Sequence, residues 1–197
     1  MRLSAKLIVV VTGVVAVMIL TIFTLLSLRY HKQIHESLLQ TARAFYSEIV
    51  VTRSWIALHS GVYVPKDEAI DPDTYYEGSE FVGPDGNEYI LKTPAQVTRE
   101  LSELSEAMGA RFRFHITSLD PVNPRNAPTD FERKALLRFR ELTTSGSYQG
   151  PLEATTVEEI DGEKYFRYFG PLVASSYCLR CHNDPGLQEG GIRGGIS

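Results

Sequence analysis

The sequence contains little cysteine and little net charge of either sign. Its only cysteines are Cys178 and Cys181, and its formal net charge is -4. A zinc site would need further ligands at a suitable spacing, and no third cysteine supplies one. A weakly acidic chain also lacks the basic footprint of a protein that binds nucleic acid. We therefore expect no nucleic-acid partner, and the two cysteines are the feature that the function must explain.

One long hydrophobic run is present near the N-terminus. It extends from Leu7 to Leu28 without a charged side chain, and about 20 such residues in a helix cross a bilayer core. The alternative is a cleaved signal peptide, whose apolar core is shorter, roughly 7 to 15 residues, and ends at a small-residue cleavage site. We therefore predict a single-pass membrane anchor over residues 1–29. Basic residues flank the run on both sides, so the positive-inside rule leaves its orientation open.

A helical pattern continues beyond this run and predicts a stalk helix over residues 30–60. Gly61 and Pro65 follow the pattern, and both residue types end helices. The stalk carries a heptad-like seam, which also makes it a candidate contact for a homodimer. The seam comprises Leu38, Ala42, Phe45, Ile49, Thr52, Ile56 and His59.

Residues 61–197 predict one domain of the α+β class. Helices are predicted over residues 93–109, with Thr93 as N-cap and Gln96 in a capping box, and from Thr129 or Asp130 to about residue 142. Because strands and helices do not alternate in a βαβ repeat, we expect an antiparallel sheet with flanking helices. The expected strands lie in HSGVYVP, FVGPDGNEYILKTP, ARFRFHITSL, LEATTVEEIDGEKYFRYFGPL and GGIRGGIS. The second and fourth of these segments are predicted hairpins, with turns at PDG, which ends at Gly86, and at DG, which ends at Gly162.

The segment CLRCH, which contains Cys178, Cys181 and His182, has the C-x-x-C-H spacing of c-type haem attachment. Two thiols at this spacing add to the two haem vinyl groups, and the following imidazole reaches the iron as an axial ligand. We predict one covalent haem c at these residues. A thioredoxin-like redox pair would begin a helix, whereas NDPGLQEGG follows here. A zinc site and a plain disulfide also remain alternatives, although a disulfide leaves His182 unexplained.

Haem attachment also predicts the side of the membrane. In bacteria, thioether bonds to haem form outside the cytoplasmic membrane. We therefore expect the domain over residues 61–197 to be periplasmic and the anchor to span the bacterial inner membrane, with the N-terminus inside.

His59 is the candidate ligand for the opposite face of the iron. It ends the stalk seam, four residues after Trp55, where a histidine needs a polar partner. A core histidine bonded to backbone is the alternative interpretation. The other histidines and methionines are less favoured, because they lie in or near the membrane, at a helix end, or on the arginine face of a strand. These are Met18, His31, His35, Met108 and His115.

The sequence resembles a known family, the membrane-anchored c-type haem sensor domains with a PAS-like fold. The similar segments are TRSWIALHSGVYVP, TPAQVTRELSE, FRFHITSLDPVNPRNAPTDFE, YFRYFGPL, CLRCH and GIRGGIS. Only CLRCH is chemically diagnostic among them. The resemblance implies a PAS-like antiparallel sheet with one haem. Such domains occur alone or in front of histidine kinases and chemotaxis receptors, which implies a signalling domain or kinase as partner.

Three functions are compatible with a haem domain on a membrane anchor. In a sensor, the redox state or a diatomic gas such as NO or O₂ changes the iron coordination, and the stalk carries the change to the membrane. A membrane-tethered monohaem electron-transfer cytochrome is the alternative. An enzyme such as a peroxidase would need a distal acid or base, and the sequence offers no such constellation. The long seam favours the sensor, because an electron carrier needs only a tether. We expect the protein not to be an enzyme.

Overall fold

The structure is a computed structural model of the chain. It describes residues 3–67, 79–110, 112–146, 149–160, 162–180, 182 and 187–197. The chain divides into two compact units, Met1–Ala42 and Arg43–Ser197. This division falls inside the predicted stalk. The boundaries between the anchor, the stalk and the haem domain therefore stay a prediction.

The first unit is formed by the N-terminal part of helix α1 (Leu3–Leu58). Within the described residues, α1 is the one helix that is long and apolar enough to cross a membrane, and none of its most apolar window is buried in the protein. Large apolar side chains are exposed along this part of the helix, for example Leu7, Leu20 and Phe23. A helix that is apolar all round and satisfies its own backbone groups suits a lipid environment. A helix long and apolar enough to cross a membrane is therefore present where the sequence predicts one.

In the second unit, α1 continues to Leu58 and ends as Gly61 predicts. The Gly61 N–H donates to the carbonyl of Ile56 at 2.9 Å. Gly61 has a φ of 113°, a conformation that side chains disfavour, and an added Cβ would lie 2.4 Å from a Leu91 side-chain atom. The glycine thus closes the helix and lets the chain turn into the first strand.

Two antiparallel sheets follow, in agreement with the predicted α+β class. The smaller sheet has the order β1-β3-β2 and the larger one has the order β4-β7-β6-β5. Both predicted hairpins are present as the antiparallel pairs β2–β3 and β5–β6. The strands are β1 (Val62–Pro65), β2 (Glu80–Val82), β3 (Glu88–Lys92), β4 (Ile116–Thr117), β5 (Ala154–Ile160), β6 (Glu163–Val173) and β7 (Ile192–Ile196).

The two predicted helices of the domain form with their predicted threonine caps. The return bond of the capping box predicted for Gln96 is not among the described contacts, and Gln96 Nε2 donates to Glu100 Oε1 at 3.2 Å. Helix α2 (Pro94–Ala107) begins after Thr93, whose side chain accepts a hydrogen bond from the Gln96 N–H. Helix α3 (Asp130–Ser145) begins with a complete capping box between Thr129 and Glu132. Each capped helix start satisfies backbone N–H groups that have no partner inside the helix. A short 3-10 helix, η1 (Pro124–Asn126), lies in the loop before α3.

One predicted strand is shorter than expected. Among the described residues of the segment ARFRFHITSL, only β4 (Ile116–Thr117) is a strand. Hydroxyl groups of α2 bind the carbonyls before it: Ser105 Oγ donates to Phe112 O, and Ser102 Oγ donates to Phe114 O. The Phe112 ring stacks on Phe45 of α1, with the ring centroids 4.2 Å apart. Contacts with two helices therefore replace strand pairing before His115, which still exchanges backbone hydrogen bonds with Ser197.

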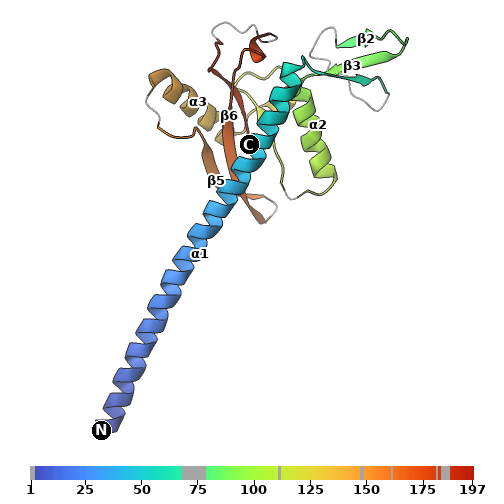
Figure 1. The fold of residues 1–197 in the computed structure, drawn as a ribbon. Helices are drawn as coiled ribbons and strands as arrows, with labels where there is room; N and C mark the ends of the chain where they lie inside the picture. The colour runs from blue at the N-terminus through green and yellow to red at the C-terminus, as the bar shows by residue number, and fades with distance from the viewer. Residues whose placement is uncertain are drawn as a thin grey trace. The chain divides into compact units, whose positions relative to one another are not determined.

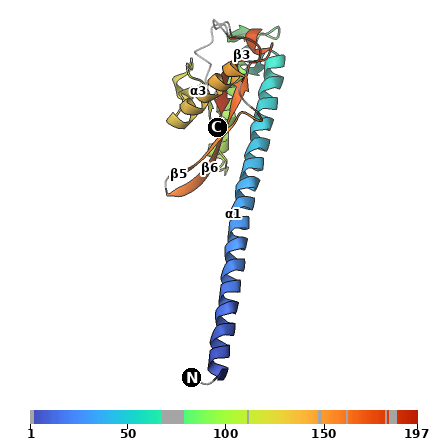
Figure 2. The same ribbon diagram turned by 90° about the vertical axis from the view of Figure 1, so that its left-hand side faces the viewer.

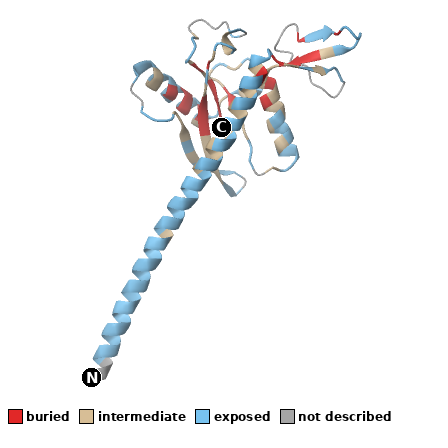
Figure 3. Ribbon diagram, in the orientation of Figure 1, coloured by how far each residue is buried: buried red, intermediate tan, exposed pale blue. Residues whose placement is uncertain are grey.

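The larger sheet has α3 on one face and the second-unit part of α1 on the other (Figures 1 and 2). Neighbouring residues of β6 show this arrangement. Phe169 is fully buried and stacks on Phe139 of α3 at 5.9 Å. A Cβ added to Gly170 would lie 2.6 Å from the Tyr46 ring of α1. Successive residues of a strand point to opposite faces, so β6 is covered on both sides, and most of the buried residues gather there (Figure 3).

Candidate functional site

The cysteine motif begins shortly after β6, in the 3-10 helix η2 (Cys178–Arg180). The Cys178 N–H donates to the carbonyl of Ser175 at 2.9 Å, and the His182 N–H donates to the carbonyl of Cys178 at 3.0 Å. The Ser175 hydroxyl lies 3.4 Å from Cys178 Sγ. These turns bring Cys178 and His182 to the wall of one cavity. Cys181 lies outside the described residues.

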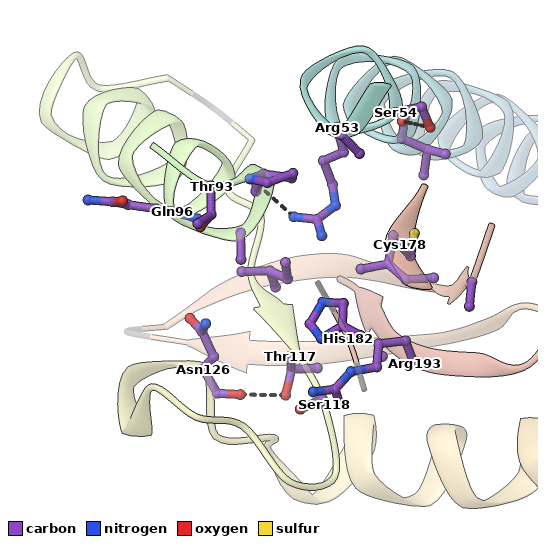
Figure 4. A pocket seen from close by; sticks show the side chains of 18 of the residues that line it. Arg53, Ser54, Thr93, Gln96, Thr117, Ser118, Asn126, Cys178, His182 and Arg193 are labelled. Atoms are coloured by element: carbon purple, nitrogen blue, oxygen red, sulfur yellow. Dashed lines mark hydrogen bonds between the residues drawn. The ribbon is translucent and has the colours of Figure 1, made fainter. Parts of the chain in front are cut away.

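This cavity, which we call the motif cavity, has a volume of about 530 Å³. Cofactor and small-molecule sites commonly have volumes of about 300 to 1,000 Å³. Its walls come from α1, the start of α2, the loop between β4 and α3, the end of β6 and the start of β7 (Figure 4). Apolar side chains line much of it, among them Val50, Ala57, Leu91, Ile116 and Leu172. The cavity thus has the size and character of a site for a largely apolar cofactor.

The charged groups of the motif cavity are all basic. Among the described residues that line it, three are arginines, Arg53, Arg99 and Arg193, and none is aspartate or glutamate. Arg99 donates to Glu103 on the next turn of α2 at 2.8 Å. The cavity therefore suits a ligand that carries negative charge.

Arg53 reaches from α1 into the motif cavity (Figure 4). Its Nη1 donates to Pro94 O at 2.9 Å and to Thr98 Oγ1 at 2.8 Å. Burial lowers the pKa of Arg53 to about 10, against a smaller opposing effect of the Cys178 sulfur. At neutral pH the guanidinium therefore still carries its charge.

Two contacts fix α1 over the sheet beside the motif cavity. The Tyr46 hydroxyl donates to the carbonyl of Pro171 on β6, and burial raises the pKa of Tyr46 to about 12. The Arg43 guanidinium forms an ion pair with Glu153, which precedes β5. The cavity wall on α1 is thereby held at two successive turns of the helix.

The structure places His59 beside the motif cavity rather than in its wall. His59 is exposed, and its Nδ1 lies 2.8 Å from the carbonyl oxygen of Trp55. Its ring packs on the Trp55 ring, with the centroids 4.3 Å apart. The next residue, Ser60, does line the cavity. Iron ligation by His59 stays a prediction, and because His59 does not line the cavity, ligation would require its side chain to move.

The less favoured ligand candidates also lie elsewhere. His115 Nδ1 lies 3.0 Å from Glu132 Oε1, and its Nε2 lies 3.2 Å from the carbonyl oxygen of Arg125. It lines a separate cavity of about 130 Å³. Met108 is 76% exposed at the end of α2. Among the described residues of the motif cavity, only His182 and Cys178 carry an imidazole, thioether or thiol group.

Sequence analysis did not identify Arg53 or Tyr46 as parts of the site. The signal was present, because Tyr46, Val50, Arg53 and Ala57 follow one another at spacings of four, three and four residues, and all line the cavity. Such spacings mark one face of a helix. A charged residue on an otherwise inward face indicates a buried polar site.

Comparisons with known proteins identify the family of the chain. The family described as Tll0287-like, Tll0287, matches residues 31–197. Among solved structures, the crystal structure of the cyanobacterial heme-protein Tll0287 is similar, with 16% sequence identity and a TM-score of 0.48. That match covers 82% of this chain and 92% of the other. A search of curated proteins gave no match. Because the family match spans most of the sequence, this chain belongs to the Tll0287-like family.

Proposed function

We propose that the chain is a membrane-anchored, periplasmic monohaem c-type protein that senses redox state or a diatomic gas. The observation that carries the proposal is that Cys178 and His182 line the same cavity of about 530 Å³. Family membership supports it, because Tll0287 is described as a heme-protein. We also propose that the haem-binding domain is a PAS-like domain.

The described residues fit the cofactor. The thiols of Cys178 and Cys181 would form the two thioether bonds, and His182 would bind the iron. Val50, Ala57 and Leu91 offer apolar contacts to a porphyrin ring, and the arginines offer positive charge to its carboxylates. When bound, haem supplies an iron that changes oxidation state and takes up diatomic gases.

The ligand set favours a sensor over an electron carrier. Cytochromes c commonly hold the iron between two side chains. Here, within the described part of the cavity wall, no side chain other than His182 and Cys178 offers a nitrogen or sulfur ligand of that kind. The sixth position would then be taken by a ligand from solvent or by His59 after its side chain moves into the cavity. An exchangeable position of this kind gives a sensor its two states.

Helix α1 supplies the route for the signal. Val50, Arg53 and Ala57 of this helix line the cavity, and the same helix contains the apolar run that we propose to cross the inner membrane. A change at the cavity wall therefore acts on a membrane helix. A signalling domain or kinase in the membrane is the partner we propose, and a homodimer through α1 stays a prediction.

We also propose that the protein is not an enzyme. Acid–base catalysis needs a positioned proton donor and acceptor near the reacting group. The described residues of the cavity wall include no carboxylate and, apart from His182, no histidine.

Optical spectroscopy of the purified full chain tests the proposal. After co-expression with a haem-maturation system, we expect a c-type spectrum whose Soret band shifts when CO is added to the reduced protein. A low-spin spectrum that is insensitive to CO in both oxidation states would instead support the membrane-tethered cytochrome. Absence of bound haem would refute both functions.

A further inference from the structure

The guanidinium of Arg53 has hydrogen-bond partners on one side only. Both of its acceptors, Pro94 O and Thr98 Oγ1, bind Nη1. Within the described part of the chain, neither Nε nor Nη2 has a protein hydrogen-bond partner. These two nitrogens form the edge of an arginine that binds a carboxylate through two parallel hydrogen bonds. Figure 4 shows this side chain pointing from α1 into the motif cavity.

Among the described residues, no carboxylate binds Arg53 or lines the cavity that it enters. Its two acceptors are a backbone carbonyl and a hydroxyl, both neutral. The described lining of the cavity contains no aspartate or glutamate. A cation that is partly removed from water is stabilised by an opposite charge. We therefore expect the negatively charged partner of Arg53 to be part of the molecule that fills the cavity.

We propose that Arg53 is an anion-binding residue, which holds a carboxylate of the cavity's ligand through Nε and Nη2. This inference rests on the proposed function, because the carboxylates in question are the two propionates of haem. His182 and Cys178 line other parts of the same cavity, so a ring bound there would be held by its iron, its vinyl-derived bonds and one propionate. Arg53 would then set how the ring is turned within the cavity and link that ring directly to α1.

The alternative role for Arg53 is purely structural. Its hydrogen bonds to Pro94 and Thr98 join α1 to α2, and loss of this tie would weaken binding of any ligand. A test must therefore separate the effect of losing the charge from the effect of losing these hydrogen bonds between α1 and α2. Arg53→Gln removes the charge and keeps an amide donor, whereas Arg53→Met removes both.

The experiment compares two ligands that differ only in their carboxylates. Zinc mesoporphyrin IX has ethyl groups in place of vinyls, so it forms no thioether bonds, and its dimethyl ester has no negative charge. Both would be titrated by fluorescence into the full chain, purified in detergent without haem. The measured quantity is the ratio of the two dissociation constants, ester over free acid. Partition of the ester into detergent is the same for every variant and cancels in the comparison.

We expect this ratio to fall by about tenfold or more in Arg53→Gln and Arg53→Met, as for the loss of charge-assisted hydrogen bonds, while the affinity for the ester is preserved. Arg99→Met is the matched control, because Arg99 lines the same cavity but is paired with Glu103. It should keep the wild-type ratio.

Two results would overturn the inference. One is an unchanged ratio in Arg53→Gln. The other is that both Arg53 variants lose affinity for both porphyrins. That result would assign Arg53 a structural role in the hydrogen bonds between α1 and α2. Failure of the wild-type protein to bind either porphyrin would instead contradict the proposed function.

Discussion

The N–H of His182 donates to the carbonyl of Cys178 at 3.0 Å. This single backbone bond spans the four-residue step from the first cysteine to the histidine, and both side chains line the motif cavity. The C-x-x-C-H spacing is therefore compatible with one compact turn that presents a thiol and an imidazole to the same ligand.

The first prediction is covalent attachment of haem at this turn. Acid acetone should leave the haem on the wild-type polypeptide and should extract it from the double variant Cys178→Ala, Cys181→Ala, because thioether bonds survive this treatment and coordination does not. Pyridine haemochrome spectra provide the measurement. Ser175→Ala, next to the motif, is the control and should keep its haem. Extraction of haem from the wild-type protein would contradict the assignment of both cysteines.

The second prediction concerns His59 as the exchangeable ligand. His59→Ala should shift the Soret and visible bands from low-spin six-coordinate toward high-spin five-coordinate and should make CO binding faster. Removal of a competing imidazole is the physical reason. His115→Ala serves as the control, because His115 is engaged by Glu132 away from the motif cavity. If His59→Ala keeps a low-spin spectrum and His115→Ala loses it, the ligand is His115 and not His59.

Much of the fold could be predicted because its signals are local. The caps at Thr93 and Thr129 and the turn at Gly86 involve residues close in sequence, and each has its predicted structural role. The strand predicted before Ile116 is shorter because carbonyl partners come from α2. The alternation of apolar and polar residues does not reveal that hydroxyl groups of a helix compete with a neighbouring strand for these carbonyls.

The cavity wall on α1 was predicted less well, for a geometric reason. A heptad seam assumes 3.5 residues per turn, and a straight helix drifts from it by about 20° per heptad. Ile56 of the seam is buried, but the seam as a whole differs from the face of α1 that carries Arg53 and Ala57 into the cavity wall. Thr52 and His59 are exposed, and Arg53 faces the cavity.

The third prediction is the topology of the chain. Alkaline phosphatase fused after Ser197 should be active, and a β-galactosidase fusion at the same position should be inactive, because haem attachment requires export. Deletion of residues 7–28 should reverse both activities and abolish covalent haem. Active β-galactosidase on the intact chain would contradict both the orientation and the haem assignment.

The fourth prediction concerns the close approach of α1 to β6 at Gly170. Gly170→Ala should destabilise the domain by about 1 to 3 kcal/mol, the usual cost of overpacking, because its Cβ would lie 2.6 Å from the Tyr46 ring. Thermal unfolding followed by near-ultraviolet circular dichroism measures the effect. In a Tyr46→Leu background the same change should cost less. Equal costs in both backgrounds would show that the contact with Tyr46 is not the cause.

A buried carboxylate ties the end of the last strand to α3. Glu132 is fully buried and accepts hydrogen bonds from Ser197 Oγ at 2.6 Å and Arg167 Nη2 at 2.8 Å, while His115 Nδ1 lies 3.0 Å away. Burial alone would raise the pKa of Glu132, but hydrogen bonds with His115, Ser197 and Thr129 lower it to about 2. The hydrogen bond with Glu132 raises the pKa of His115, against burial.

The fifth prediction follows from these opposite shifts. Glu132 stabilises the fold above its usual pKa of 4.5, and that contribution is lost as the pH falls toward 2. Protonated His115 stabilises it below the usual histidine value of 6.5, and that contribution is lost as the pH rises through its raised pKa. The Tm should therefore fall as the pH is raised above about 6.5. His115→Gln should flatten this decline, and His31→Ala, which changes an exposed histidine of the first unit, should preserve it. An unchanged slope in His115→Gln would assign the pH dependence to another group.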